Sequence, residues 1–190
     1  TIITSEHFHS RIKTKKQMQK IHDFLSRSFN KIEIVCYFRE PVEAAISGYS
    51  TVIKMGWSSN LEGWLEENCR PDNYYYNHKK IADNWSEVFG IENCHFHLYD
   101  SQRDVFEHFS SVVGIRGATN RGADAGNSSL TNLQAQAFRV INKKIPFMSG
   151  GNISRSMKNR KARATVMRSE LYNYGTIQSD LEPELRERFK

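Results

Sequence analysis

The chain has 190 residues, of which 38% are hydrophobic and 12% aromatic, so it is the size of one ordinary domain and can build an apolar core. Its formal net charge of +6 favours an anionic partner: a nucleotide, an acidic glycan, nucleic acid or a membrane surface. No stretch is long and apolar enough to cross a bilayer, and the N-terminus does not resemble a signal peptide.

The first half of the chain alternates between strand and helix patterns. Residues 1–4 are all β-branched and predict the end of a buried strand, and apolar positions at helical spacing predict an amphipathic helix over residues 13–29. Residues 31–38 contain a continuous apolar run, which is typical of a strand covered on both faces in a parallel sheet. Helical spacing resumes over residues 42–53, directly after Pro41.

The second half continues this alternation. We expect helices over residues 77–89 and 105–113, because each apolar stripe ends at a glycine, and a strand over residues 95–99 between them. Residues 114–129 lack periodicity and predict a long loop, and residues 130–141 return to helix. This order of elements favours a layered α/β fold in a single domain spanning residues 1–190.

A one-sided basic segment follows. Residues 125–169 contain no acidic residue, whereas they hold nine basic ones: Arg139, Lys143, Lys144, Arg155, Lys158, Arg160, Lys161, Arg163 and Arg168. We consider three interpretations of this run, namely a solvated surface, a lid over a nucleotide, and a groove for an acidic acceptor such as a polysaccharide.

The cysteines do not predict a metal site. Cys36, Cys69 and Cys94 are far apart, form no CxxC pair and have no histidine at metal-ligand spacing. Cys36 and Cys94 lie in apolar, strand-like runs, where a free thiol behaves as a small hydrophobic side chain.

An arginine and a serine form the most informative motif. Arg39 follows the predicted buried strand, and Ser47 comes eight residues later on the next helix. Ligands of open α/β sheets bind beyond the carboxyl ends of the strands, so Arg39 stands where a ligand is expected. Its guanidinium fits two phosphate oxygens and Ser47 can add a hydroxyl bond, although Arg39 pairing with Glu40 or Glu43 is an alternative.

This segment resembles the 3′-phosphate motif of sulfotransferases that use 3′-phosphoadenosine-5′-phosphosulfate (PAPS). Arg39, Pro41, Ser47 and Tyr49 match the family's pattern as they stand. The wider series is similar to a bacterial sulfotransferase-like group through residues 3–8, 76–90, 95–99 and 127–130. The resemblance implies a three-layer αβα fold with a mainly parallel sheet, related to that of P-loop NTPases.

The resemblance also implies a catalytic base and a covering loop. In the family, the strand before the motif ends near the acceptor hydroxyl and often supplies the general base, and Glu6 and His7 occupy that place here. The alternative is that Ser5 and Glu6 only cap the following helix. The loop 117–126, with Arg116 and Arg121, lies in chain order where the family covers the adenosine.

One departure from the family concerns its 5′-phosphosulfate loop. Members hold this group with a glycine- and lysine-containing loop between the first strand and the first helix, and no segment of this chain has that form. Because the loop belongs upstream of residues 1–4 and the chain opens on Thr1 rather than methionine, we expect that an upstream part of the protein is missing.

The expected function is therefore transfer of a sulfuryl group from PAPS to a hydroxyl of a carbohydrate or another small acceptor, without a metal. The alternative is a non-catalytic module that binds a nucleotide or glycan within a larger carbohydrate-modifying enzyme. No nucleic-acid partner is expected, because basic and aromatic residues are not interleaved on one module. The bacterial resemblance favours the cytoplasm, whereas a eukaryotic relative would work in the secretory pathway.

Overall fold

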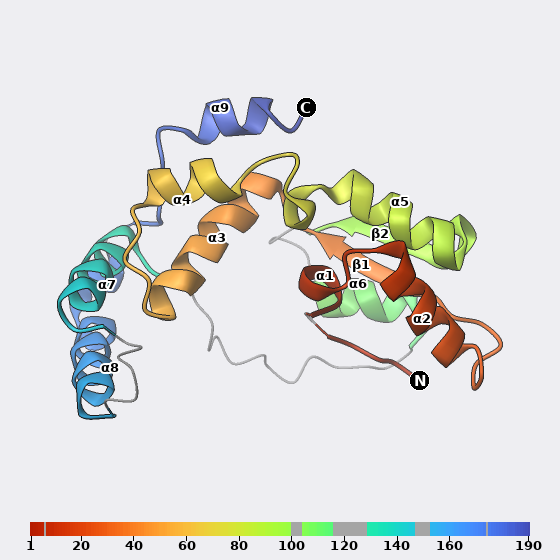
Figure 1. The fold of residues 1–190 in the computed structure, drawn as a ribbon, viewed down its shortest axis with the longest axis horizontal. Helices are drawn as coiled ribbons and strands as arrows, with labels where there is room; N and C mark the ends of the chain where they lie inside the picture. Colours follow the sequence, from red (N-terminus) through yellow and green to blue (C-terminus); the bar gives the residue numbers. More distant parts are fainter. Residues whose placement is uncertain (6, 100–103, 116–128, 147–152, 174) are drawn as a thin grey trace. The chain divides into compact units, whose positions relative to one another are not determined.

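The computed structural model describes residues 1–5, 7–99, 104–115, 129–146, 153–173 and 175–190 (Figure 1). Over these described residues the protein is α/β and 61% helical, with a small open sheet of two parallel strands. It divides into two compact units, one formed by residues 1–40 and 71–120 and the other by residues 41–70 and 121–190. The single sulfotransferase-like domain over residues 1–190 stays a prediction from the sequence.

The sheet belongs to unit 1 and confirms two predicted strands. Strand β1 (Ile34–Phe38) pairs in parallel with β2 (Cys94–Leu98), with Ile34 opposite Cys94 and Phe38 opposite Leu98. Only Phe38 is fully buried within β1. The other four residues of β1 are half-buried, because a strand with one neighbour in a two-stranded sheet is shielded less than a central strand.

The predicted strand over residues 1–4 does not form. Residues 1–5 have no regular secondary structure and are exposed, including Ile2 and Ile3. β-Branched side chains favour an extended backbone, but a strand also needs a hydrogen-bonded neighbour, and none of the described strands pairs with this segment.

Helices complete unit 1. These are α1 (His7–Arg11), α2 (Lys15–Leu25), α5 (His78–Phe89) and α6 (Val105–Val112), with the 3-10 helices η1 (Tyr74–Tyr76) and η2 (Ile91–Asn93). Helix α2 begins after a capping box between Thr14 and Gln17, and it is shorter than the helix predicted over residues 13–29. Helices α5 and α6 end at Gly90 and close to Gly114, as predicted, and both glycines have a positive φ.

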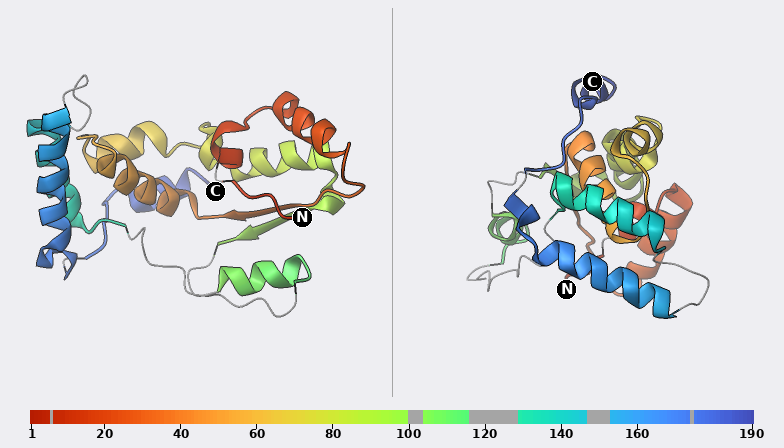
Figure 2. Two further views of the ribbon diagram at one scale, coloured as in Figure 1. Left: turned by 90° about the horizontal axis from the view of Figure 1, so that it is seen from below. Right: turned by 90° about the vertical axis from the view of Figure 1, so that its left-hand side faces the viewer.

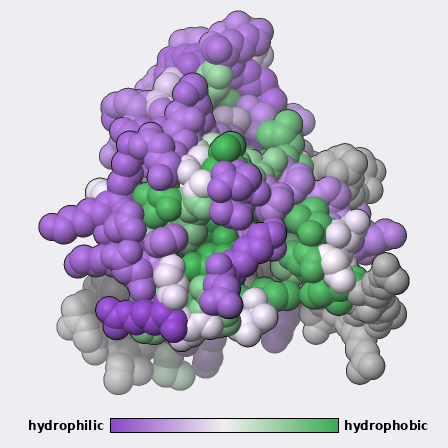
Figure 3. Space-filling model, turned by 90° about the vertical axis from the view of Figure 1, so that its right-hand side faces the viewer, coloured by the Kyte–Doolittle hydropathy of each residue, from purple (hydrophilic) through white to green (hydrophobic). Residues whose placement is uncertain are grey.

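The core of unit 1 lies between α2, α5 and the sheet. Its buried residues are Met18, Phe38, Ile81, Trp85 and Phe89. The rings of Trp85 and Phe89 stack with centroids 5.4 Å apart. On the face of unit 1 that carries α2 and α5, apolar side chains are visible between hydrophilic ones (Figure 3).

Helix α6 lies against the other face of the sheet (Figure 2). His108 on α6 is 2.7 Å from the Tyr37 hydroxyl through its Nδ1, and its ring meets that of His97 edge-on with centroids 4.6 Å apart. Because side chains alternate between the faces of a strand, Tyr37 points to α6 while Phe38 points to the core.

Unit 2 is built from helices alone among its described residues. They are α3 (Pro41–Lys54), α4 (Leu61–Asn68), α7 (Asn132–Lys144), α8 (Ile153–Arg168) and α9 (Glu182–Glu187), with the 3-10 helix η3 (Glu170–Asn173). Pro41 is the first residue of α3, where its missing N–H costs little. The buried core residues include Val42, Ile53, Leu65 and Phe138.

A network of buried hydrogen bonds holds α8 against α7 and α3 in unit 2. The Asn159 side chain is fully buried and donates from Nδ2 to Asn142 Oδ1 at 3.2 Å and to the Ile145 carbonyl at 2.6 Å. Arg163 donates to Asn159 Oδ1 at 3.2 Å and also to the Lys54 carbonyl of α3. These bonds join α8 to α7 and α3 at one place.

Replacing Asn159 with alanine should lower the free energy of unfolding by about 1–3 kcal/mol, because buried partners then lose their hydrogen bonds. Urea-induced unfolding followed by circular dichroism measures this loss. The control is Gln136→Ala on the exposed face of α7, which should change stability by no more than about 0.5 kcal/mol. Equal stability of the two variants would show that the network contributes nothing.

Among the described residues, no helix combines the length and the apolar character that a membrane span requires.

Candidate functional site

The carboxyl ends of both strands carry ring and charged side chains. Arg39 directly follows β1 and Tyr99 directly follows β2, and the Tyr99 N–H donates to the Phe38 carbonyl at 2.7 Å. The guanidinium carbon of Arg39 lies 5.2 Å from the centroid of the Tyr99 ring. Parallel pairing thus brings a half-buried cation and an aromatic face together at one edge of the sheet.

His78 joins this edge from the start of α5. Its ring stacks on Phe38 with centroids 4.5 Å apart and an interplanar angle of 16°. Burial lowers the pKa of His78, and so does the neighbouring His9, whereas Glu40 acts in the opposite direction. His78 is therefore neutral over a wider pH range than an exposed histidine.

His9 comes to the same edge from α1. Its ring stacks on Tyr75 with centroids 4.3 Å apart, and its Nε2 lies 2.7 Å from the Tyr75 carbonyl oxygen. Because a carbonyl only accepts hydrogen bonds, Nε2 carries the proton and Nδ1 is the basic nitrogen of the neutral ring. Burial lowers the pKa of His9, against the opposing effect of this hydrogen bond.

We call His9, Arg39, Tyr75, His78 and Tyr99 the carboxyl-edge cluster. All five lie in unit 1. The cluster combines one guanidinium, which binds oxyanions, with two imidazoles that are neutral near pH 7, which accept protons. Such a set can hold an anion and remove a proton from a neighbouring group.

Comparison with known proteins adds no relative. No protein-family model, curated protein or solved structure matches this chain.

The two residues of the predicted phosphate clamp fall in different units. Arg39 belongs to unit 1, whereas Ser47 lies half-buried on α3 in unit 2, since the unit boundary falls between Glu40 and Pro41. Their pairing stays a prediction from the sequence. Tyr49, the last residue of the matched pattern, is buried and donates its hydroxyl to the Ser59 carbonyl at 3.1 Å, which is a structural contact within unit 2.

Of the two residues predicted as the general base, the structure describes only His7. Glu6 lies outside the described residues, as do Arg116, Arg121 and the loop 117–126. His7 is exposed at the first position of α1, and its backbone N–H donates to the Ser5 hydroxyl oxygen at 3.1 Å. This bond supports the alternative in which Ser5 caps the helix.

The two cysteines of the sheet, Cys36 and Cys94, are half-buried free thiols rather than fully buried ones. Burial raises the pKa of the Cys36 thiol to about 11, and it also raises that of Cys94. Cys69 is fully buried, and its thiol lies 3.9 Å from the Pro41 carbonyl oxygen. Within the described ranges, no three residues among His, Cys, Asp and Glu are grouped as metal ligands would be.

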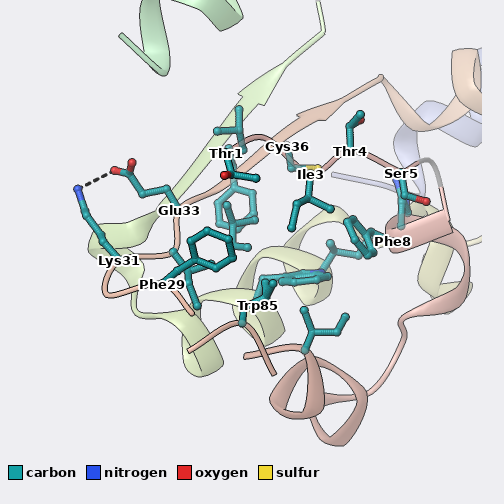
Figure 4. Close-up of a pocket in the computed structure, with 18 residues that line it drawn as sticks. Thr1, Ile3, Thr4, Ser5, Phe8, Phe29, Lys31, Glu33, Cys36 and Trp85 are labelled. Carbon is teal, nitrogen blue, oxygen red and sulfur yellow. Dashed lines mark hydrogen bonds and ion pairs between the residues drawn. The ribbon is translucent and has the colours of Figure 1, made fainter. Parts of the chain in front are cut away.

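A pocket of about 300 Å³ lies beside the core of unit 1. Figure 4 shows Ile3, Phe8, Phe29 and Trp85 around it, with the Lys31–Glu33 ion pair at one side. Of the carboxyl-edge cluster it includes only His9. Its mostly apolar lining is unsuited to a phosphate, so the cluster is the better candidate for an anion.

His9 and His78 are site residues that the sequence alone did not suggest. His9 lies in a helix of five residues, and His78 begins α5 after the cap residue Asn77. Helical periodicity gives neither histidine a role, because only the parallel pairing of β1 with β2 sets the edge at which both rings meet Phe38.

Proposed function

We propose that this protein is a PAPS-dependent sulfotransferase in which Arg39 and Ser47 hold the 3′-phosphate of the nucleotide. The observation that carries the proposal is Arg39 at the carboxyl end of a parallel strand, followed at once by α3 with Ser47. A planar guanidinium and a hydroxyl suit a phosphate monoester, because together they supply several donors to its oxygens.

The finer fold belongs to the same proposal. A three-layer αβα domain with a larger parallel sheet would place Arg39 at the usual ligand-binding edge of such sheets. The two-stranded parallel sheet, with α5 on one face and α6 on the other, is compatible with that arrangement.

The carboxyl-edge cluster supplies a base for the transfer. The acceptor hydroxyl loses its proton to the base as its oxygen forms a bond to sulfur, and the bond between sulfur and the bridging phosphate oxygen breaks. Adenosine 3′,5′-bisphosphate leaves with the electron pair of that bond. His9 suits the role through its basic Nδ1, and Glu6 and His7 remain the candidates suggested by the resemblance.

The alternative is a non-catalytic module that binds a nucleotide or glycan. A glycine- and lysine-containing phosphate loop is required by the sulfotransferase and dispensable in this module. The partners of the enzyme would be the nucleotide donor and a hydroxylated acceptor, in the cytoplasm of a bacterium or in the secretory pathway of a eukaryote.

Calorimetric binding tests the proposal through the 3′-phosphate. Adenosine 3′,5′-bisphosphate should bind about 10- to 100-fold more tightly than adenosine 5′-monophosphate, since a charge-assisted contact contributes about 1.5–3 kcal/mol. Equal affinity for the two nucleotides would contradict a 3′-phosphate clamp. Binding with this preference but without sulfuryl transfer from PAPS to any of a panel of sugars would favour the non-catalytic alternative.

A further inference from the structure

Helix α8 in unit 2 presents a row of cations on one face. Lys158, Lys161 and Arg168 are exposed, and their spacing places them within about 80° around the helix and over about 15 Å of its length. No acidic residue interrupts residues 125–169. Lys143 and Lys144 are exposed in the last turn of α7, the helix that packs beside α8 (Figure 2).

The opposite face of α8 packs against the rest of unit 2. Asn159 is fully buried against α7, and Arg163 lies over the Phe138 ring at 4.8 Å while donating to the Lys54 carbonyl. These contacts determine which side of α8 turns inward. The row formed by Lys158, Lys161 and Arg168 is consequently presented on the side that faces solvent.

The acidic side chains of α9 have partners of their own. Glu182 pairs with Arg186, Glu184 with Arg188, and Glu187 with Lys190. These pairs lie within or next to α9, so this helix offers little spare negative charge to the cations of α8.

The chemistry of the row selects among polyanions. Stacking of the bases of a single-stranded nucleic acid needs exposed aromatic rings, and α8 contains no aromatic residue. Binding in a membrane interface needs a broad apolar face, whereas the large exposed apolar side chains described on α8 are only Met157 and Met167. A linear polymer with regularly spaced carboxylates or sulfates makes neither demand.

We propose that the exposed row on α8, defined as Lys158, Lys161 and Arg168, binds a linear acidic polysaccharide. This deepens the proposed function and rests on it only in one respect, namely that the polysaccharide would be the sulfuryl acceptor. Binding itself needs no nucleotide, so it is measured separately from the transfer reaction.

The test is binding of fluorescent polygalacturonate to the full chain at low and at moderate salt. The triple variant K158Q/K161Q/R168Q removes the three positive charges and should bind polygalacturonate about tenfold more weakly. Added salt should also weaken binding to the unmodified protein, because salt screens exposed ionic contacts. The matched control K13Q/K16Q/K20Q removes three exposed lysines from unit 1 and should have little effect. Circular dichroism establishes that both variants are folded.

Four outcomes would overturn the proposal. They are absence of polygalacturonate binding, an equal loss in the control variant, tighter row-dependent binding of duplex or single-stranded DNA, and tighter row-dependent binding of phosphatidylglycerol vesicles. Loss of the nucleotide preference described above would remove the acceptor role while leaving polysaccharide binding intact. Thus a failure of this surface and a failure of the sulfotransferase proposal give different results.

Discussion

Replacing Arg39 with alanine should weaken the binding of adenosine 3′,5′-bisphosphate by about 10- to 100-fold, as measured by calorimetry. The side chain sits at the carboxyl edge of the sheet, over the Tyr99 ring, and brings a fork of N–H donors to that edge. Without it, the 3′-phosphate loses its charge-assisted contacts. Adenosine 5′-monophosphate, which lacks this group, should bind both proteins equally.

Two further variants sharpen this experiment. Arg27→Ala removes an equal charge from an exposed position of unit 1 and should leave binding unchanged. Arg39→Lys keeps the charge but loses the planar fork, so it should bind with intermediate affinity. If Arg39→Ala binds as tightly as the unmodified protein, Arg39 does not hold the phosphate and the sulfotransferase proposal loses its main support.

The second large effect concerns the catalytic base. Three variants test the candidate bases: Glu6→Gln, His7→Gln and His9→Gln. The variant that removes the base should lower kcat by about 10²- to 10⁴-fold, with little change in nucleotide binding. We expect this loss for His9→Gln, because the Tyr75 carbonyl holds the ring with Nδ1 as its basic atom. Sulfuryl transfer from PAPS to a supplied acceptor is the reaction measured.

The pH dependence distinguishes His9 from a residue that only supports the fold. A general base acts in its unprotonated form, and burial lowers the pKa of His9 below its ordinary value of about 6.5. Activity should therefore persist at pH 6.5 and fall only as the pH drops through the lowered pKa. Full activity of His9→Gln, or an acid limb that this substitution leaves unchanged, would exclude His9 as the base.

Much of the local structure follows from the spacing of apolar residues and from the proline and glycine residues at the ends of helices. The parallel strands, the helix that begins at Pro41 and the helix that ends at Gly90 all match their predictions to within one to three residues. These elements are predictable because their apolar spacing and their caps act within a few residues of chain. The strand predicted over residues 1–4 does not form, because a strand depends on a hydrogen-bonded neighbour that local composition does not reveal.

Sequence patterns predict β1, β2 and the helices α2, α3, α5, α6 and α7 in their order, together with the basic segment and the motif from Arg39 to Ser47. The contacts between side chains that are distant in the chain are visible only in the folded structure. Parallel pairing of β1 with β2 brings Tyr99 under Arg39, and packing of α1 and α5 against that edge brings His9 and His78 to Phe38. Such contacts depend on long-range packing and on the burial of whole faces of helices and sheets, which local propensity does not encode.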